Sequence, residues 1–328
     1  MVSTFPVNPS KLGTIIPLLH AFNLAQIFHE EFIINIDDSY VPNSHFNILK
    51  ELKYWGIKPN GNNYISSLSE KSLQHFLSTF LYNSISQKKS KLVSCKCGKL
   101  ELFGRDLSEG MYGKSKVEEN KKCKFCKSSH TLYQNQLFAT FGNPLHSSHK
   151  IYPQNMQKFY NSKYLPNTVK EFRISRARKT PYKINFQDKT YYLDPDFINI
   201  LSPELLRNGK PLKIIYSQKR PEKLFLMNTL LGSNTDFIGI PYLIDFNKCY
   251  ELIKAQSNNY KYLTVFIALC TSWNKQKNQC NEAILRTYSK LSNSQKDFYY
   301  KEIMASKSID AYLKTFNNNI LSFKCPEI

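Results

Sequence analysis

Short apolar runs and amphipathic stretches alternate at the start of the chain. The segment "TFPV", residues 4–7, predicts a short strand that Pro6 interrupts. Apolar residues then recur on one face with helical spacing up to Phe28, and Pro17 stands where such a helix would begin. The run "FIINI", residues 32–36, is followed directly by polar residues and predicts a buried strand of a parallel sheet.

A second amphipathic stretch follows, and we expect Ser44 to cap this helix and Gly56 to end it. The order strand, helix, strand, helix is typical of a parallel α/β sheet, where ligands bind beyond the carboxyl ends of the strands. Asp37 and Asp38 stand at that place, after the run "FIINI". Ligand binding and an ordinary capping or turn role are both open for these two residues.

Helical spacing returns after Asp245 and predicts a small α-helical domain near the C-terminus. A packed helical core is the simplest role for this domain, and anticodon binding or docking is the alternative. We therefore divide the chain into a first half of a nucleotide-binding domain (1–90), an inserted knuckle (91–130), a second α/β half with a basic strand (131–244) and a helical domain (245–328).

Four of the eight cysteines form two close pairs. Cys95 and Cys97 are followed, after 25 intervening residues, by Cys123 and Cys126. Thiolates bind zinc tetrahedrally, and two short pairs joined by a loop are the usual way to build such a site. Because four sulfurs leave no position for a water molecule, we expect a structural zinc ion that stabilises the knuckle. Substitution of one sulfur by His130, or four unrelated free thiols, are the alternatives.

The charge of the chain points to a polyanionic partner. Among its 328 residues, 45 Lys and Arg face 25 Asp and Glu, a formal net charge of +20. Such a surface binds nucleic acid through counterion release. We expect no membrane partner, because no amphipathic basic helix is evident and the longest apolar run, Tyr262 to Trp273, is shorter than the roughly 20 residues that span a bilayer. A basic surface without a partner, in a protein from an AT-rich genome, is the alternative.

The start of the chain carries no secretory signal pattern, and the cysteine usage fits a reducing compartment, which is the cytoplasm or an organellar matrix.

Basic residues are concentrated in the middle of the chain. Residues 161–223 contain 14 Lys and Arg against 6 Asp and Glu, with tyrosines between them. Guanidinium groups contact phosphates and rings stack on unpaired bases, so this segment predicts an RNA-binding strand. A solvated edge strand protected by charge is the alternative. The predicted RNA-binding residues are Arg173, Arg176, Arg178, Lys179 and Tyr182.

The motifs "PSKLG…HAFNLAQIF…FIINIDDSYV…ILKELKYWGIKPN" resemble the nucleotide-binding half of class I aminoacyl-tRNA synthetases of the glutamyl type. The segment "EFRISRARKTPY" is similar to a strand and turn of the same family, and also to its methionyl branch. The Cys-x-Cys knuckle is similar in kind and position. The resemblance implies tRNA as partner, ATP and magnesium as cofactors, and cofactor contacts by Ser10, Gly13, Asp37, Lys219 and Arg220.

The chain departs from this family at positions that matter for catalysis. The family's HIGH tetrapeptide should fall at residues 16–19, where the sequence is "IPLL". Pro6 occupies the place of the arginine that would hold a glutamate side chain. The Lys219 segment, "SQKR", has an extra residue relative to the family's loop. The side chains that would stabilise charge during adenylate formation are therefore missing or displaced.

The predicted fold is α/β, with a Rossmann-like parallel sheet, an inserted zinc knuckle and a C-terminal α-helical domain. Two functions fit it. In the first, the chain is a synthetase-like protein that binds tRNA and attaches glutamate with ATP. In the second, it is a catalytically inactive, zinc-stabilised RNA-binding protein, such as a structural component of an organellar ribosome that contacts rRNA. A zinc-ribbon protein of unrelated fold is a third candidate. Whether the chain is an enzyme stays open at this stage.

Overall fold

The computed structural model of the chain describes residues 1–9, 11–38, 47–68, 70–78, 84–97, 101–103, 122–141, 150–163, 170–177, 179–206, 210–217, 235–271 and 277–316.

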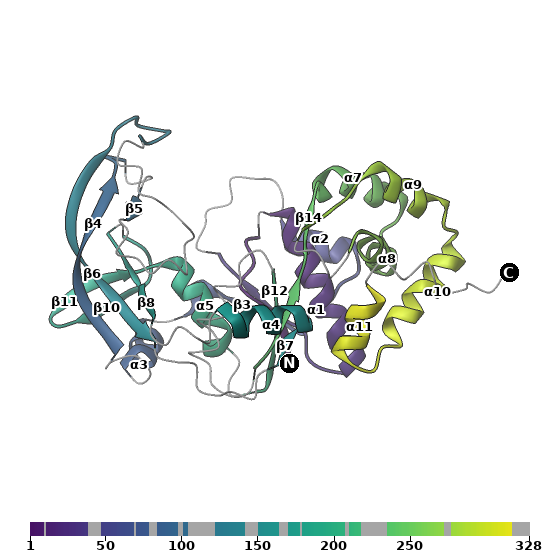
Figure 1. Cartoon of the computed structure of the whole chain (residues 1–328), viewed down its shortest axis with the longest axis horizontal. Coiled ribbons are helices and arrows are strands. Elements are labelled where there is room, and N and C mark those ends of the chain that lie inside the picture. Colours follow the sequence, from purple (N-terminus) through teal and green to yellow (C-terminus); the bar gives the residue numbers. More distant parts are fainter. Residues whose placement is uncertain are drawn as a thin grey trace.

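A parallel sheet forms the centre of the molecule (Figure 1). Four strands lie in the order β1 (Val2–Thr4), β12 (Leu212–Ser217), β13 (Thr235–Ile240) and β7 (Ile151–Tyr152), and each pair is parallel. Two further parallel strands, β2 (Ile33–Ile36) and β3 (Gly61–Tyr64), join this sheet through parallel bridges of Val2 with Phe32 and of Val7 with Ile36. The predicted parallel α/β sheet is confirmed, although the first strand begins two residues earlier than expected.

Helix α1 (Ile15–Phe28) connects β1 to β2 and is buried along most of its length. The sequence allows this because the helix is apolar on nearly all sides rather than on one stripe. Helix α2 (Ile48–Tyr54) begins later than predicted. Its N-cap is Asn47, whose side chain accepts a hydrogen bond from the backbone N–H of Leu49, whereas Ser44 lies outside the described residues. Gly56 follows the helix with φ of 72°, as a helix-ending glycine does.

A second, antiparallel sheet lies at one end of the molecule, on the left of Figure 1. Its strands are arranged in the order β5 (Glu101–Phe103), β4 (Ile85–Ser94), β6 (His130–Phe141) and β8 (Lys170–Arg173). Strands β4 and β6 are paired over their whole described overlap, from Ile85 with Ala139 to Ser94 with His130, and form a long curved ribbon.

A smaller antiparallel sheet packs beside this ribbon. It contains β10 (Lys183–Phe186), β11 (Lys189–Leu193) and β9 (Ser175–Arg176). Helices α3 (Glu70–Phe76), α4 (Gln154–Lys163) and α5 (Pro195–Leu206) and the short segment η2 (Ile65–Ser67) complete this part of the described chain, whereas η1 (Leu12–Thr14) directly precedes α1.

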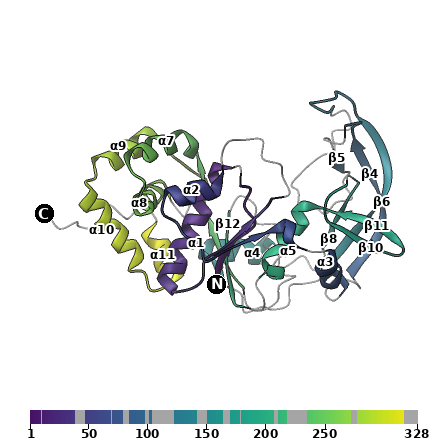
Figure 2. The ribbon, with the colours of Figure 1, turned by 180° about the vertical axis from the view of Figure 1, so that it is seen from behind.

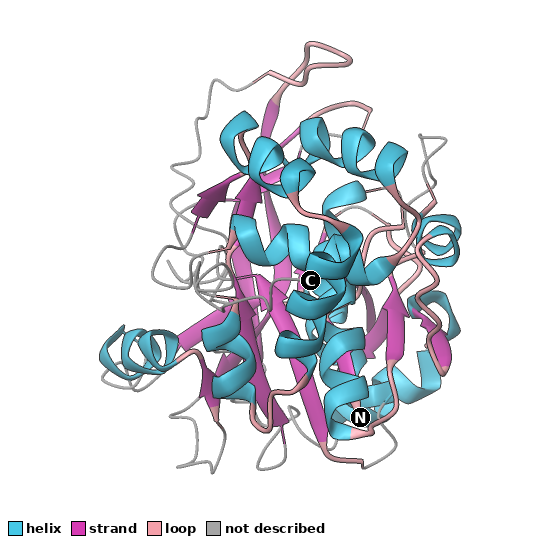
Figure 3. Cartoon of the chain, turned by 90° about the vertical axis from the view of Figure 1, so that its right-hand side faces the viewer, coloured by secondary structure: helices cyan, strands magenta, loops and turns pink. Residues whose placement is uncertain are grey.

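The C-terminal part is helical, as predicted, and lies at the opposite end of the molecule from the ribbon (Figures 1 and 2). Its helices are α7 (Phe246–Gln256), α8 (Tyr260–Cys270), α9 (Glu282–Lys290), α10 (Asn293–Met304) and α11 (Ile309–Thr315). Strand β14 (Tyr242–Ile244) precedes α7, strand β15 (Lys277–Gln279) lies between α8 and α9, and the two strands pair in parallel. Figure 3, viewed from this end, shows the helices in front of the strands.

Two hydrophobic cores organise the described residues. The first joins β1, α1, β2 and α2 to the C-terminal helices, from Val2 to Phe316. The second lies under the antiparallel sheets and contains residues from α3, α4, α5 and β12. The C-terminal helices therefore share a core with the N-terminal unit, and the predicted four-part division stays a prediction. Among the described residues, no helix combines the length and the apolar character that crossing a membrane requires.

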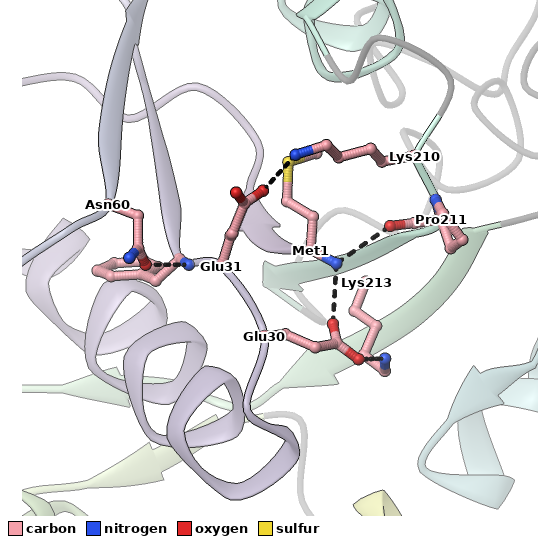
Figure 4. A network of polar contacts seen from close by, with 8 residues as sticks. Met1, Glu30, Glu31, Asn60, Lys210, Pro211 and Lys213 are labelled. Carbon is pink, nitrogen blue, oxygen red and sulfur yellow. Dashed lines mark hydrogen bonds and ion pairs between the residues drawn. The ribbon is translucent and has the colours of Figure 1, made fainter.

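Polar contacts fix the amino edge of the parallel sheet (Figure 4). The amino group of Met1 donates to Glu30 Oε2 at 2.9 Å and to the carbonyl oxygen of Pro211 at 3.2 Å. Glu30 also pairs with Lys213, and Glu31 pairs with Lys210 at 2.7 Å. These contacts hold together the starts of β1, β2 and β12, and the carboxyl edge of the sheet lies on the other side.

Candidate metal centre and basic ribbon

The four predicted metal ligands come together at the end of the ribbon. Cys95 and Cys97 follow β4, and Cys123 and Cys126 precede β6, so the pairing of Ser94 with His130 brings the two pairs side by side. Their sulfur atoms all lie within 4.8 Å of one another. The Sγ of Cys97 lies 3.3 Å from that of Cys95 and 3.6 Å from that of Cys123. This cluster could hold a metal ion.

Local backbone structure positions the second cysteine pair. The N–H of Cys123 donates to the carbonyl oxygen of Ser128, and the N–H of Lys127 donates to that of Cys123, at 3.1 and 3.0 Å. Lys127 closes this turn in the left-handed conformation, with φ of 54°. The hydrogen bond between Cys126 and Ser128, at 3.1 Å, lowers the pKa of Cys126 to about 5. A thiol with such a pKa is a thiolate at neutral pH, the form that binds metals.

His130, the alternative ligand that would replace one sulfur, is not part of the cluster. Its Nε2 lies 3.0 Å from the hydroxyl of Ser94, its partner across the β4–β6 ladder. The four sulfurs form the candidate site without it.

The ribbon is strongly basic. We use the name basic ribbon for residues 84–97 and 122–141, which contain seven lysines and no aspartate or glutamate. Six of these lysines are described with their side chains and all six are exposed: Lys88, Lys89, Lys96, Lys122, Lys124 and Lys127. Charge of one sign over an extended surface, with no neutralising carboxylate in either segment, is the electrostatic footprint of a polyanion-binding surface.

The predicted RNA-binding strand needs a correction. Strand β8 ends at Arg173, whose side chain is 3% exposed, and its guanidinium donates to the carbonyl oxygen of Ser175 and to Asp194 at 2.6 and 3.3 Å. Tyr182 is also buried, at 4% exposure. Buried side chains cannot reach a phosphate or a base, so these two residues do not belong to an RNA-binding surface in this conformation.

The other predicted residues of this strand have different environments. Arg176 is 22% exposed and donates to Asp194 at 2.9 Å. Lys179 is exposed, and Arg178 lies outside the described residues. Sequence reasoning missed Asp194, which is fully buried and binds both arginines, because it lies 18 and 21 residues from them in the chain.

Asp37 and Asp38 lie at the carboxyl edge of the parallel sheet, after β2. Asp37 is buried, and its Oδ2 accepts a hydrogen bond from Asn199 of α5 at 3.0 Å. Asp38 accepts from the backbone N–H and the hydroxyl of Ser66. The contacts of Asp38 are those of a turn residue, whereas Asp37 places a carboxylate beside an amide side chain at the edge where parallel sheets bind ligands.

The start of α1 is poorly suited to phosphate binding. A Cβ atom added to Gly13 would meet no atom within 4 Å, so the backbone there borders open space. The first turns of α1, however, present Ile15, Ile16 and Leu18 to the core. Of the residues predicted to contact a cofactor, Ser10, Lys219 and Arg220 lie outside the described part of the chain.

His20 is the histidine nearest to the position of the family's HIGH tetrapeptide, and it faces the C-terminal helices instead of the sheet edge. Its Nδ1 lies 2.9 Å from the hydroxyl of Tyr312 in α11, and its ring is 2% exposed. Burial lowers the pKa of His20 to about 3, so the ring is neutral at physiological pH. His20 is therefore part of the contact between α1 and α11.

Comparison with known proteins adds two solved structures. No protein-family model matches the chain, and no curated protein matches its sequence. A glutamate tRNA ligase from Elizabethkingia meningosepticum is similar over 98% of this chain and 79% of its own, with a TM-score of 0.44 and 10% identity. A glutamate-tRNA synthetase from Elizabethkingia anophelis is similar over 98% and 80%, with a TM-score of 0.41 and 10% identity. At 10% identity, the role of each side chain has to come from this chain's own geometry.

Proposed function

We propose that this chain is an RNA-binding protein that uses its basic ribbon to contact tRNA or rRNA. The observation that carries the proposal is the ribbon itself, with seven lysines, no carboxylate residue and all six described lysine side chains exposed. The phosphate backbone of RNA supplies the complementary charge at regular spacing. The resemblance of the N-terminal motifs to aminoacyl-tRNA synthetases makes tRNA the first RNA to test.

The proposal includes a structural zinc ion at Cys95, Cys97, Cys123 and Cys126. A zinc–sulfur bond of about 2.3 Å gives a tetrahedron with edges of about 3.8 Å. The sulfur separations of 3.3 and 3.6 Å, with all of them below 4.8 Å, fit that size. Bound zinc would fix the turn of residues 122–127, which carries Lys122, Lys124 and Lys127. Thiols this close need a reducing compartment, such as the cytoplasm or an organellar matrix, to stay reduced.

The salt dependence of RNA binding tests this function. Labelled tRNA is titrated with the protein from 50 to 300 mM salt, and the slope of log K against log salt concentration counts the phosphates neutralised. The test variant carries Lys96→Ala, Lys122→Ala and Lys124→Ala, which lie beside the four cysteines at the end of the ribbon, called the tip below. The control carries Lys301→Ala, Lys307→Ala and Lys314→Ala, which remove the same charge from exposed positions of the helical end.

The tip variant should bind more weakly and lose about 2 to 3 units of slope, since each phosphate contact contributes roughly 0.7 to 0.9. The helical variant should keep the slope of the unchanged protein. Equal losses in the two variants would mean that only net charge matters, and the ribbon would then not be the binding surface.

A second candidate function is the attachment of glutamate to tRNA with ATP and magnesium. The observation that favours it is the buried carboxylate of Asp37, beside Asn199, at the carboxyl edge of the parallel sheet. The apolar first turns of α1 argue against it, because they offer no polar side chain to the phosphates of ATP. ATP–pyrophosphate exchange in the presence of tRNA and glutamate decides the matter. Exchange that Asp37→Ala abolishes would support the enzyme, and no exchange would remove this candidate.

A further inference from the structure

The outer half of the ribbon is open to solvent on both faces. In β6, six consecutive residues, 130–135, are exposed, whereas residues 136–139 are buried. Side chains alternate between the two faces of a strand, so consecutive exposure means that neither face is covered there. This segment and the cysteine turn carry the two most exposed large apolar side chains of the described residues, Phe125 at 69% and Tyr133 at 63%.

A groove of about 630 Å³ runs between this part of the ribbon and β11. The pairing of Lys89 with Asn135 places Lys89 on the same face as Tyr133, and the Lys89 Nζ lies 5.9 Å from the centre of the Tyr133 ring. Lys189 lines the opposite wall. The lining is completed by Gln87, Gln134, Asn135, Thr190 and Tyr191, and the described lining residues include no carboxylate. Asp188, next to Lys189 in the β10–β11 turn, lines a separate hollow beside α3.

We propose that this groove binds an unpaired RNA strand, with a base stacked on Tyr133 and phosphates held by Lys89 and Lys189. The proposal rests on the RNA binding proposed above and specifies the form of RNA that this surface takes. Lysines alone would serve duplex and single strand equally. An exposed ring adds binding energy only where a base face is available, and in a duplex those faces are stacked on one another. The amide of Asn135, on the same face as Tyr133, can hydrogen-bond base edges that pairing would otherwise occupy.

Changes at the Tyr133 ring test the proposal. Tyr133→Leu keeps an apolar side chain and removes the ring, and Tyr133→Phe keeps the ring. The control is Tyr54→Leu, which removes another exposed tyrosine beside a lysine, with Lys254 Nζ 4.7 Å from the ring centre, on the α2–α7 side of the molecule. The probes are a labelled 12-nucleotide oligouridine and a fully paired RNA hairpin that is closed by a non-nucleotide linker and has equal charge, titrated at one salt concentration.

We expect Tyr133→Leu to weaken oligouridine binding by roughly 5- to 150-fold, the range for losing one stacked base. Hairpin binding by this variant, and oligouridine binding by Tyr133→Phe and Tyr54→Leu, should stay within about twofold of the unchanged protein. Circular dichroism and zinc content check the fold of each variant. If Tyr133→Leu loses its fold or its zinc, Tyr133→Trp is tested in its place. Oligouridine should then quench the fluorescence of the introduced tryptophan, and the hairpin should not. Equal quenching by both RNAs, or no quenching by either, would overturn the proposal.

Other outcomes separate this proposal from the one on which it rests. If oligouridine binds Tyr133→Leu as tightly as the unchanged protein while the lysine variant of the tip still loses affinity, the groove proposal fails and RNA binding stands. If neither RNA binds, both proposals fail. Binding of phosphatidylserine vesicles or of polyglutamate with the same dependence on Tyr133, in the absence of RNA binding, would also overturn both and would identify another polyanionic partner.

Discussion

Asp194 offers a sharp test of the packing around the second core. Its carboxylate is fully buried and accepts from Arg173 and Arg176 at 3.3 and 2.9 Å. Its own backbone N–H donates to the carbonyl oxygen of Ile174 at 2.8 Å. Asp194→Asn preserves the shape of the side chain and removes the charge that both guanidinium groups share.

The expected loss in the free energy of unfolding depends on which of the two arginines is accessible to water. Removing one partner of a buried ion pair costs about 3 to 5 kcal/mol, because the other charge stays buried without compensation. Arg176 is 22% exposed and can regain hydration, whereas Arg173 at 3% cannot. Because the carboxylate is lost beside one arginine that stays buried instead of two, the expected loss lies near the lower limit, at about 3 kcal/mol. With a denaturant slope of roughly 3 kcal/mol per molar urea, the unfolding midpoint should fall by about 1 M.

Urea unfolding followed by circular dichroism measures the loss. The matched control is Asp188→Asn, the same substitution at an exposed position of the nearby β10–β11 turn, which should change the free energy of unfolding by less than about 0.5 kcal/mol. Equal stability of Asp194→Asn and Asp188→Asn would refute the reasoning. Arg173→Ala adds a second check: it should destabilise the protein and leave the salt slope of RNA binding unchanged, and the opposite result would restore Arg173 to the RNA-binding surface.

The remaining predictions concern the metal and the pH. Elemental analysis should find about one zinc ion per chain in the unchanged protein and none in Cys123→Ala. The control Cys249→Ala, which changes a buried thiol outside the cluster, should keep its zinc. Zinc retention in both variants would rule out the four-cysteine site. The pKa of His20 is about 3 in the folded chain and 6.5 when unperturbed, so between these values the unfolded chain binds the extra proton. The free energy of unfolding should therefore decrease as the pH is lowered below 6.5, by up to about 1.4 kcal/mol per pH unit. Because His20→Gln lacks this group, its urea midpoint should decrease less between pH 7.5 and pH 5.5 than that of the unchanged protein.

Local patterns in the sequence were sufficient to predict the first strand–helix–strand–helix unit of the parallel sheet, but not β3, β7, β12 and β13. The run "FIINI" became β2, the helix after it ended at Gly56, and the region after Asp245 became helical. The two cysteine pairs predicted a common site because their spacing is itself a chemical pattern. The lack of acidic residues in the two ribbon segments is also visible in the sequence, but only the structure shows that these segments are paired.

Arginine side chains were harder to place, because periodicity describes one segment at a time. Nothing near Arg173 indicates that Asp194 will neutralise it, since that contact depends on how β8, β9 and α5 pack. The exposure of the tyrosines also depends on contacts between distant segments: Tyr133 is 63% exposed, whereas Tyr182 is only 4% exposed. The sequence by itself therefore determined the first local elements, the helical C-terminal part and the four candidate metal ligands. The tertiary structure decided which charges and rings face solvent, because burial is a property of contacts between segments distant in the chain.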